Sequence, residues 1–240
     1  MKKEKNFSRT RWRFQARLNT IVFFVLLGIV ATPVLSLSFS AGASSSNSVL
    51  SADAVLAQLI EGNQRYVKGR LSHPNQTLDR IHEVAKEQHP IAVILGCADS
   101  RVPPEILFDQ GIGNLFVIRE AGNIVDDAVL ASMEYAIEHL GVSLIIVLGH
   151  ERCGAVEAAL HGTYHGHIGT LIDAISPAVE RVKGKQGDLT DLVVRANVEN
   201  VVDRLIHAKP ILDKKITEGK LKVVGGYYDL DTGKVDLIAR

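Results

Sequence analysis

Two cysteines and one histidine have the types and the spacing of metal ligands. Cys97 and Cys153 are the only cysteines of the 240-residue chain, and His150 lies three positions before Cys153. Thiolate and imidazole groups are preferred ligands of Zn²⁺, and a site with three protein ligands keeps a fourth position open for reaction. His150 and Cys153 share one short turn, so Cys97 must approach from another part of the fold. The residue types predict a catalytic zinc site with one ion per chain.

An acid and a base follow the first cysteine in the segment Cys-Ala-Asp-Ser-Arg-Val-Pro-Pro-Glu, residues 97–105. Asp99 and Arg101 are two positions apart on a predicted loop, where a carboxylate and a guanidinium can form a charge-assisted, bidentate pair. Such a pair would hold Asp99 ionised beside a metal ligand, as part of the shell that orients the site. The alternative is a surface ion pair of little energetic value.

Apolar runs identify the strands that must carry these residues. Residues 91–96 and 143–149 are continuous apolar segments that end directly before Cys97 and His150, and residues 115–118 form a similar segment. Runs of this kind are typical of strands that are buried on both faces of a sheet.

Further strands and helices complete an alternating pattern. Two more strands, 221–228 and 234–238, flank a turn at 231–233. Helical spacing of apolar residues predicts helices at 48–69, 126–139, 152–160, 168–183 and 188–207. Alternating strands and helices predict an α/β fold: a mainly parallel sheet of about four to five strands with helices on both faces. Sites in such sheets lie beyond the carboxyl ends of the strands, where Cys97 and His150 fall.

The first 43 residues differ from the rest of the chain. Seven Lys and Arg residues precede an apolar run at 20–37, and a segment of small residues with Ala41-Gly42-Ala43 follows. This order predicts a signal peptide over 1–43 and one mature domain over 44–240, exported to the periplasm or another extracytoplasmic space. The run of about 18 apolar residues also reaches the lower limit for a membrane span, so an uncleaved anchor is the alternative.

Charge and compartment restrict the possible partners. The chain has 27 basic and 27 acidic residues. Residues 1–43 hold seven of the basic and one of the acidic residues, so the remainder has 20 basic and 26 acidic residues. A mildly acidic body lacks the basic patch of a nucleic-acid binder, and we expect no such partner. In an exported protein the two cysteines also fit a single disulfide, but their positions beside the predicted strand ends favour zinc.

Five segments of the chain together resemble the β-class carbonic anhydrases. They are Cys-Ala-Asp-Ser-Arg-Val-Pro-Pro-Glu at 97–105, Gly-His-Glu-Arg-Cys-Gly-Ala at 149–155, Leu-x-x-Gly-Asn-x-Arg-Tyr at 59–66, Phe-Asp-Gln-Gly-x-Gly-x-Leu-Phe-Val-Ile-Arg-x-Ala-Gly-Asn at 108–123, and Gly-Tyr-Tyr-Asp-Leu-x-Thr-Gly-Lys at 226–234. The resemblance covers about residues 50–240.

The resemblance implies zinc-dependent, reversible hydration of carbon dioxide to bicarbonate and a proton by a zinc-bound hydroxide. It matches Cys97, His150 and Cys153 to the zinc ligands and Asp99 and Arg101 to the dyad that orients the hydroxide. It places Gln110 at the substrate pocket. It also implies an extending N-terminal helix and a homodimer or higher homo-oligomer.

Several alternatives stay open in the sequence. Asp99 could close the site as a fourth zinc ligand, and carbonyl sulfide or carbon disulfide could be the substrate instead. A zinc-binding protein without turnover and a disulfide-bonded exported domain are further possibilities. A histidine cluster, His161, His165 and His167, could transfer protons or could simply be a solvated loop.

Overall fold

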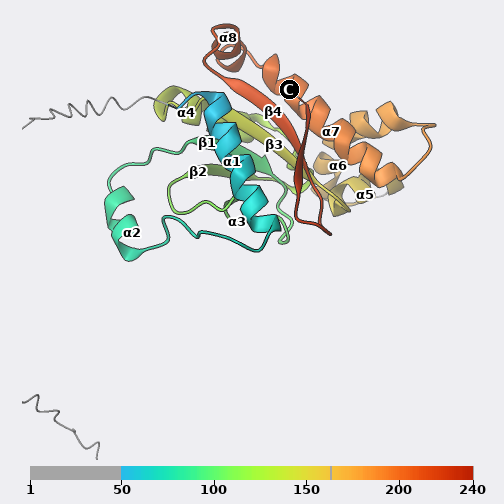
Figure 1. The fold of residues 1–240 in the computed structure, drawn as a ribbon. Coiled ribbons are helices and arrows are strands. Elements are labelled where there is room, and N and C mark those ends of the chain that lie inside the picture. The colour runs from blue at the N-terminus through green and yellow to red at the C-terminus, as the bar shows by residue number, and fades with distance from the viewer. Residues whose placement is uncertain (1–49, 163, 240) are drawn as a thin grey trace, which may run out of the picture. The chain divides into compact units, whose positions relative to one another are not determined.

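The computed structural model describes residues 50–162 and 164–239 and contains a five-stranded sheet (Figure 1). The strands are β1 Ala92–Gly96, β2 Leu115–Arg119, β3 Leu144–His150, β4 Lys222–Tyr228 and β5 Val235–Ala239. Their order is β2-β1-β3-β4-β5; the first four are parallel, and β5 pairs antiparallel with β4. The predicted α/β class with a mainly parallel sheet is confirmed.

The helices connect these strands. They are α1 Ala52–Val67, α2 Leu78–Val84, α3 Pro104–Leu107, η1 Ala121–Asn123, α4 Asp127–His139, α5 Gly154–His161, α6 Ile168–Val182, α7 Leu189–Ile206 and α8 Leu212–Thr217. The predicted helices are all present, and Asp126 caps the start of α4, since its side chain accepts a hydrogen bond from the N–H of Val129. The short helices α2, α3 and α8 were not predicted.

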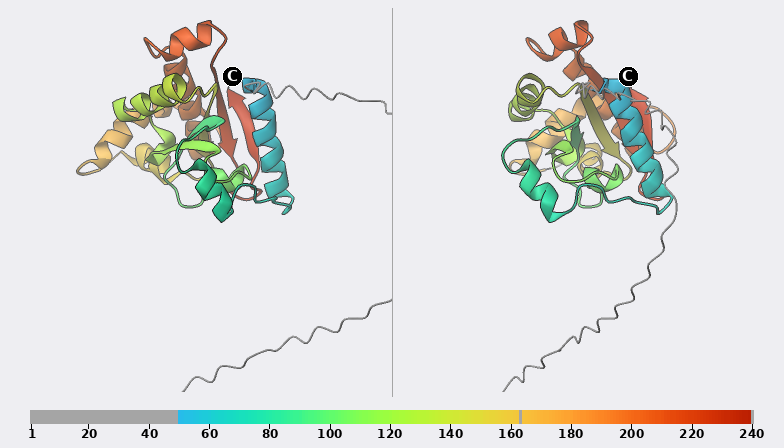
Figure 2. Two further views of the ribbon diagram at one scale, coloured as in Figure 1. Left: turned by 90° about the vertical axis from the view of Figure 1, so that its left-hand side faces the viewer. Right: turned by 60° about the vertical axis from the view of Figure 1, so that its left-hand side comes forward.

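Helices cover both faces of the sheet, as the apolar strands require. Alternate residues of β1 point to opposite faces: Val93 and Leu95 pack with α4, α7 and α8, whereas Ala92 and Ile94 pack with α1 and α3. Figure 2 shows α1 on one side of the sheet and α4, α6 and α7 on the other. The central strands β1 and β3 are therefore buried along their whole length.

Strand β2 departs from the expected burial. Its sequence is as apolar as that of β1, but all five of its residues are partly exposed. The reason is its place in the sheet order, because an edge strand has a neighbouring strand on one side only. A continuous apolar run thus identified a strand without fixing its position in the sheet.

The strand register brings the predicted ligands together. Gly96, the last residue of β1, is paired with Leu148 of β3, and His150 is paired with Tyr228 of β4. Cys97 and His150 consequently leave adjacent strands at the same edge of the sheet.

Asn63 ties α1 to the rest of the fold. Its buried side chain donates hydrogen bonds to the carbonyl oxygens of Leu107 and Gly233, at 3.1 and 2.9 Å, and accepts one from the N–H of Val235 at 2.9 Å. Asn63→Ala would leave three backbone groups unpaired, and each buried unpaired group costs about 1–3 kcal/mol. We expect the free energy of unfolding to fall by about 3 kcal/mol in chemical denaturation.

Gln64→Ala is the matched control, because Gln64 is an exposed neighbour on the same helix. Its effect should stay within about 0.5 kcal/mol. Equal stability of the two variants would show that Asn63 contributes nothing beyond its place on the helix.

The leader and its predicted cleavage site lie outside the described residues. Among the residues that the structure describes, none of the helices has the length and apolar character needed to cross a membrane.

Candidate metal centre

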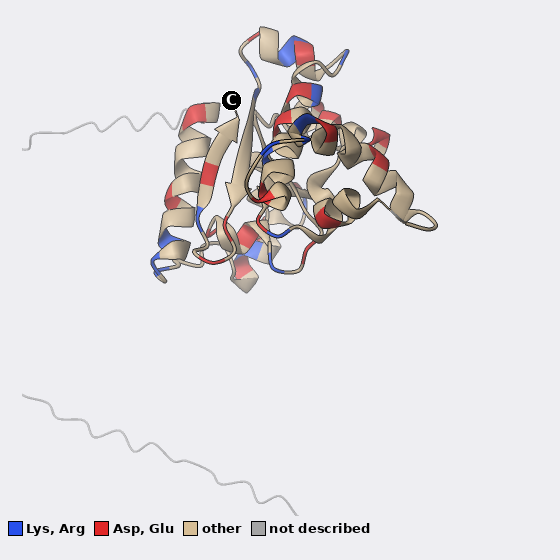
Figure 3. Cartoon of the chain, turned by 90° about the vertical axis from the view of Figure 1, so that its right-hand side faces the viewer, with Lys and Arg blue, Asp and Glu red and all other residues tan. Residues whose placement is uncertain are grey.

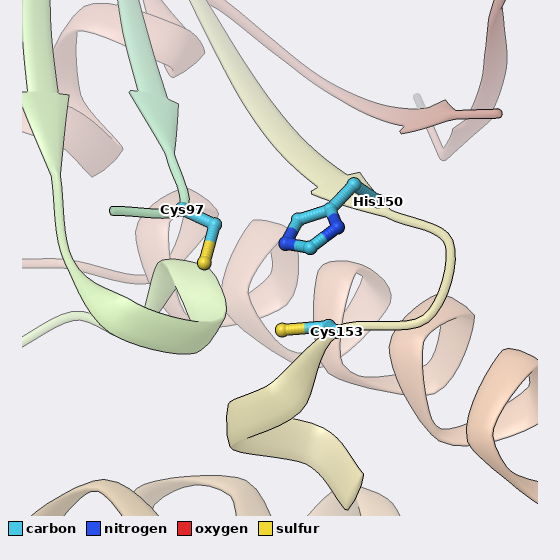
Figure 4. A group of neighbouring side chains, drawn as sticks. All are labelled: Cys97, His150 and Cys153. Carbon is cyan, nitrogen blue, oxygen red and sulfur yellow. The ribbon is translucent and has the colours of Figure 1, made fainter. Parts of the chain in front are cut away.

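The side chains of Cys97, His150 and Cys153 converge on one point beyond the sheet (Figure 4). Their ligand atoms all lie within 4.8 Å of one another, and all three residues are buried, with relative exposures of 4, 0 and 2%. Cys97 directly follows β1, His150 ends β3, and Cys153 caps the start of α5. The structure therefore brings together the three residues that were predicted from their types and spacing.

The turn between His150 and Cys153 depends on two local features. Gly149 lets β3 approach α7, because a Cβ atom at this position would lie 2.5 Å from Val198 Cγ2. Arg152 has a φ of 51°, in the left-handed region, so the chain reverses sharply before Cys153. Because β3 packs closely against α7 and the chain reverses at Arg152, Cys153 comes back toward the imidazole of His150.

His150 presents a free lone pair to the centre of the group. Its Nδ1 lies 2.9 Å from the carbonyl oxygen of Glu151, which can only accept, so Nδ1 carries the proton. Nε2 is buried and has no hydrogen-bond partner within the described residues. A buried nitrogen without a partner is unfavourable in an apolar site but suits a metal ligand. The donor set of two sulfurs and this nitrogen fits zinc.

The two cysteines are free thiols, and each affects the pKa of the other. A hydrogen bond from Cys153 outweighs the effect of burial and lowers the pKa of Cys97. The backbone N–H groups of Gly122 and Asp99 also donate to Cys97 Sγ, at 3.3 and 3.4 Å. The hydrogen bond to the Cys97 thiolate, together with burial, raises the pKa of Cys153. A bound dication would stabilise both cysteines as thiolates. The pair therefore suits a metal site, where cysteine ligands must be deprotonated.

Asp99 and Arg101 form the predicted bidentate pair. Arg101 Nε donates to Asp99 Oδ1 at 2.9 Å, Nη2 donates to Oδ2 at 2.7 Å, and the Arg101 backbone N–H also donates to Oδ1 at 2.9 Å. The hydrogen bond from Arg101 lowers the pKa of Asp99 to about 2. Asp99 Oδ2 is 3.9 Å from His150 Nε2. The carboxylate is thus ionised, engaged by arginine, and next to the group of ligand atoms.

Gln110 has other partners within the described part of the chain. Its side chain is buried, donates to the carbonyl oxygen of Phe108 at 3.0 Å and accepts from Asn114 Nδ2 at 2.9 Å. It lines a different cavity, of about 390 Å³, together with Gln76 and Glu105. Among the described residues no hydrogen bond joins Gln110 to the three candidate ligands, so its role at a substrate pocket stays a prediction.

Two residues at the site, Gly122 and Arg119, belong to the segment 108–123, but no role was predicted for them from the sequence. Gly122 supplies an N–H to Cys97 Sγ. Its φ of 71° favours glycine, and a Cβ atom at this position would lie only 2.7 Å from Ile175 Cδ1. Arg119 donates to the backbone of the loop that carries Cys97 and Asp99. Their presence in the segment 108–123 was the available signal.

Comparisons with known proteins agree with this geometry. The family model described as "Carbonic anhydrase" matches residues 92–235. "Carbonic anhydrase 2" of Mycobacterium tuberculosis is 44% identical over 186 residues, which cover 75% of this chain and 89% of the relative. A "Carbonic anhydrase" of Mycolicibacterium smegmatis is 38% identical, with the same shares covered.

A solved structure extends the likeness from sequence to fold. The β-carbonic anhydrase of Coccomyxa, solved in complex with acetazolamide, superposes with a TM-score of 0.60 at 30% identity and covers 76% of this chain and 86% of that one. The family model spans more than half of the chain, and the relatives match it over three quarters of its length. This chain belongs to the β-carbonic anhydrase family.

Proposed function

We propose that the chain catalyses the reversible hydration of carbon dioxide to bicarbonate and a proton, with one zinc ion held by Cys97, His150 and Cys153. The observation that carries this proposal is the buried, unpartnered Nε2 of His150, which faces two thiols beside a carboxylate held by arginine. Membership of the family supports the substrate, and the donor set supports the metal.

Zinc and Asp99 would have different roles in this reaction. Zinc, when bound, is a Lewis acid that lowers the pKa of water so that hydroxide is available near neutral pH. Asp99, which Arg101 keeps ionised, would accept a hydrogen bond from the attacking oxygen and aim its lone pair at the substrate carbon. Two thiolates already balance the charge of the dication, so we expect activity to favour mildly alkaline conditions.

The direct test measures carbon dioxide hydration by the purified chain before and after removal of zinc. We expect one zinc per chain, loss of activity with the metal, and recovery when zinc is returned. Bound zinc without hydration would indicate a binding protein or a different substrate, and an assay with carbonyl sulfide separates those two outcomes. A protein that binds no zinc would refute the proposal.

We infer that the active form is a homodimer or a higher homo-oligomer. Helix α2 has no buried residue, and its Leu78 and Ile81 are 75 and 45% exposed. Ile106 and Ile112 are also exposed. Apolar side chains left in water on one chain are explained if a second copy covers them. Light scattering across a range of protein concentrations would measure the mass; a monomer throughout would contradict the inference.

We expect no nucleic-acid partner. Figure 3 shows acidic and basic residues interspersed over the helices of one face. Such a surface, on a domain with an excess of acidic residues, does not provide the continuous basic stripe that binds phosphates.

We propose that the enzyme is exported and that the leader is removed. N-terminal sequencing of protein recovered outside the cytoplasm should begin at or within a few residues of Ser44, because Ala41-Gly42-Ala43 has the small residues of a cleavage site. A chain that retains Met1 and sediments with membranes would show the leader to be an anchor.

A further inference from the structure

Arg119 lies at the end of β2, directly beside the loop that begins with Cys97. The parallel register pairs Arg119 with Gly96, and the following N–H, that of Glu120, donates to the carbonyl oxygen of Gly96 at 3.1 Å. The ladder between β1 and β2 therefore continues up to the residue before the cysteine. This pairing leaves the Arg119 side chain next to the backbone of residues 97–99.

The guanidinium group of Arg119 joins two points of that loop. Nε donates to the carbonyl oxygen of Cys97 at 2.9 Å, and Nη2 donates to the carbonyl oxygen of Asp99 at 2.5 Å. Arg119 is only partly exposed and forms no ion pair among the described residues. Two of its N–H donors thus hold the backbone of one candidate ligand and that of the carboxylate residue that would orient the nucleophile.

One planar cation fixes the relative placement of these two residues. The carbonyl oxygens of Cys97 and Asp99 both accept hydrogen bonds from this guanidinium, so its positive charge offsets the repulsion between the two oxygens. A guanidinium has a rigid fork of donors, whereas an ammonium is a single flexible point charge. The arrangement therefore requires arginine for its geometry as well as for its charge.

The same segment also holds the sulfur atom. Three residues after Arg119, the N–H of Gly122 donates to Cys97 Sγ at 3.3 Å, and the Gly122 carbonyl oxygen accepts a hydrogen bond from the buried Asn197 of α7 at 2.9 Å. Residues 119–122 contact Cys97 at both its backbone and its side chain.

We propose that Arg119 is a positioning residue for carbon dioxide hydration: it holds the Cys97–Asp99 loop so that Cys97 faces the metal and Asp99 faces Arg101. This proposal rests on the proposed function. Loss of the fork should let the loop relax, which misplaces one ligand and the orienting carboxylate together. Removal of groups that orient metal ligands typically costs about 10- to 100-fold in metal affinity or activity.

The test compares Arg119→Met and Arg119→Lys with Arg70→Met in the full chain. Arg70 is exposed, and no side-chain hydrogen bond or ion pair of it is found in the described part of the structure, so its substitution makes the same charge change without the contacts. The measurements are kcat/KM for hydration, the rate of zinc loss to a chelator, and the absorption spectrum of the cobalt-substituted protein, which reports the geometry at the metal.

We expect Arg119→Met to lower kcat/KM by about 10- to 100-fold, to release zinc faster, and to shift the cobalt spectrum. Arg119→Lys should lose less activity than Arg119→Met, because it keeps the charge but not the fork, and Arg70→Met should match the unsubstituted chain. If Arg119→Met does not fold, the comparison of Arg119→Lys with the control decides the question.

The proposal is overturned if the folded Arg119 variants equal Arg70→Met in activity, zinc loss and cobalt spectrum. It is also overturned if they only lower the melting temperature, since a purely structural role would leave the spectrum unchanged. A failure of the proposed function is a different result: the unsubstituted chain would then bind zinc without hydrating carbon dioxide, and the cobalt spectra would still decide on Arg119.

Discussion

Cys97→Ser, His150→Ala and Cys153→Ser should each remove most of the zinc and nearly all hydration activity. Three protein ligands leave no redundancy, because a zinc site that keeps its fourth position open for reaction depends on all three. Serine is a poor zinc ligand beside a thiolate, and alanine at 150 deletes the unpartnered Nε2. We expect less than about 1% of the activity to remain, because a site that has lost its metal has lost the Lewis acid that supplies hydroxide.

Two readouts besides activity make this prediction sharp. Zinc content should fall from one per chain to near zero, and the rise in melting temperature that zinc gives the unsubstituted protein should disappear, because a ligand that binds only the folded state stabilises it. His207→Ala is the control, since the His207 side chain is 73% exposed at the end of α7 and is not a candidate ligand. Full activity in any of the three ligand variants would end the assignment.

The sheet and the candidate ligands could be predicted because their signals are local. The runs 91–96 and 144–149 are apolar, which predicts strands, and the residues at the ends of such strands are expected at the carboxyl edge of a parallel sheet. Cys97 and His150 were selected by that position together with their residue types. Asp99 and Arg101 are two positions apart, so their pairing needed no knowledge of the rest of the fold.

The features that sequence reasoning missed depend on contacts between distant segments. Helix α3 has four residues and α8 has six, too few for an apolar period to show. The edge position of β2 is set by the sheet order and not by its composition. Arg119 gains its role from the register of β2 on β1, which no pattern of residues 115–119 reveals. Asn63 bonds to Gly233, 170 positions away.

Substitutions of Asp99 and Arg101 distinguish a catalytic zinc site from a structural one. Asp99→Asn keeps the shape of the side chain but removes its charge, so the attacking oxygen loses its acceptor while the three ligands stay in place. We expect zinc to remain nearly stoichiometric and activity to fall by about 10²–10⁴-fold. Asp236→Asn is the matched control, because Asp236 pairs with Lys234 on the exposed side of β5 and should lose nothing measurable.

Arg101→Ala should also be severe, for a different reason. The hydrogen bond from Arg101 is the main cause of the low pKa of Asp99, and Arg101 engages both carboxylate oxygens. Asp99 Oδ2 already lies 3.9 Å from His150 Nε2, so a small rotation would bring an unpaired carboxylate to the open position of the metal. Asp99 would then compete with water for that position, and residual activity should rise more steeply with pH than in the unsubstituted enzyme.

The decisive measurement takes zinc content and hydration rate together for both variants between about pH 6.5 and 9. Asp99 stays ionised throughout this range in the unsubstituted enzyme, because its pKa is about 2, so the dyad itself adds no titration there. A steeper profile in Arg101→Ala, but not in Asp99→Asn, is expected because only the former retains a carboxylate that can close the site. Near-normal rates in both variants would show that Asp99 and Arg101 form only a surface salt bridge. The zinc site would then carry out some other chemistry.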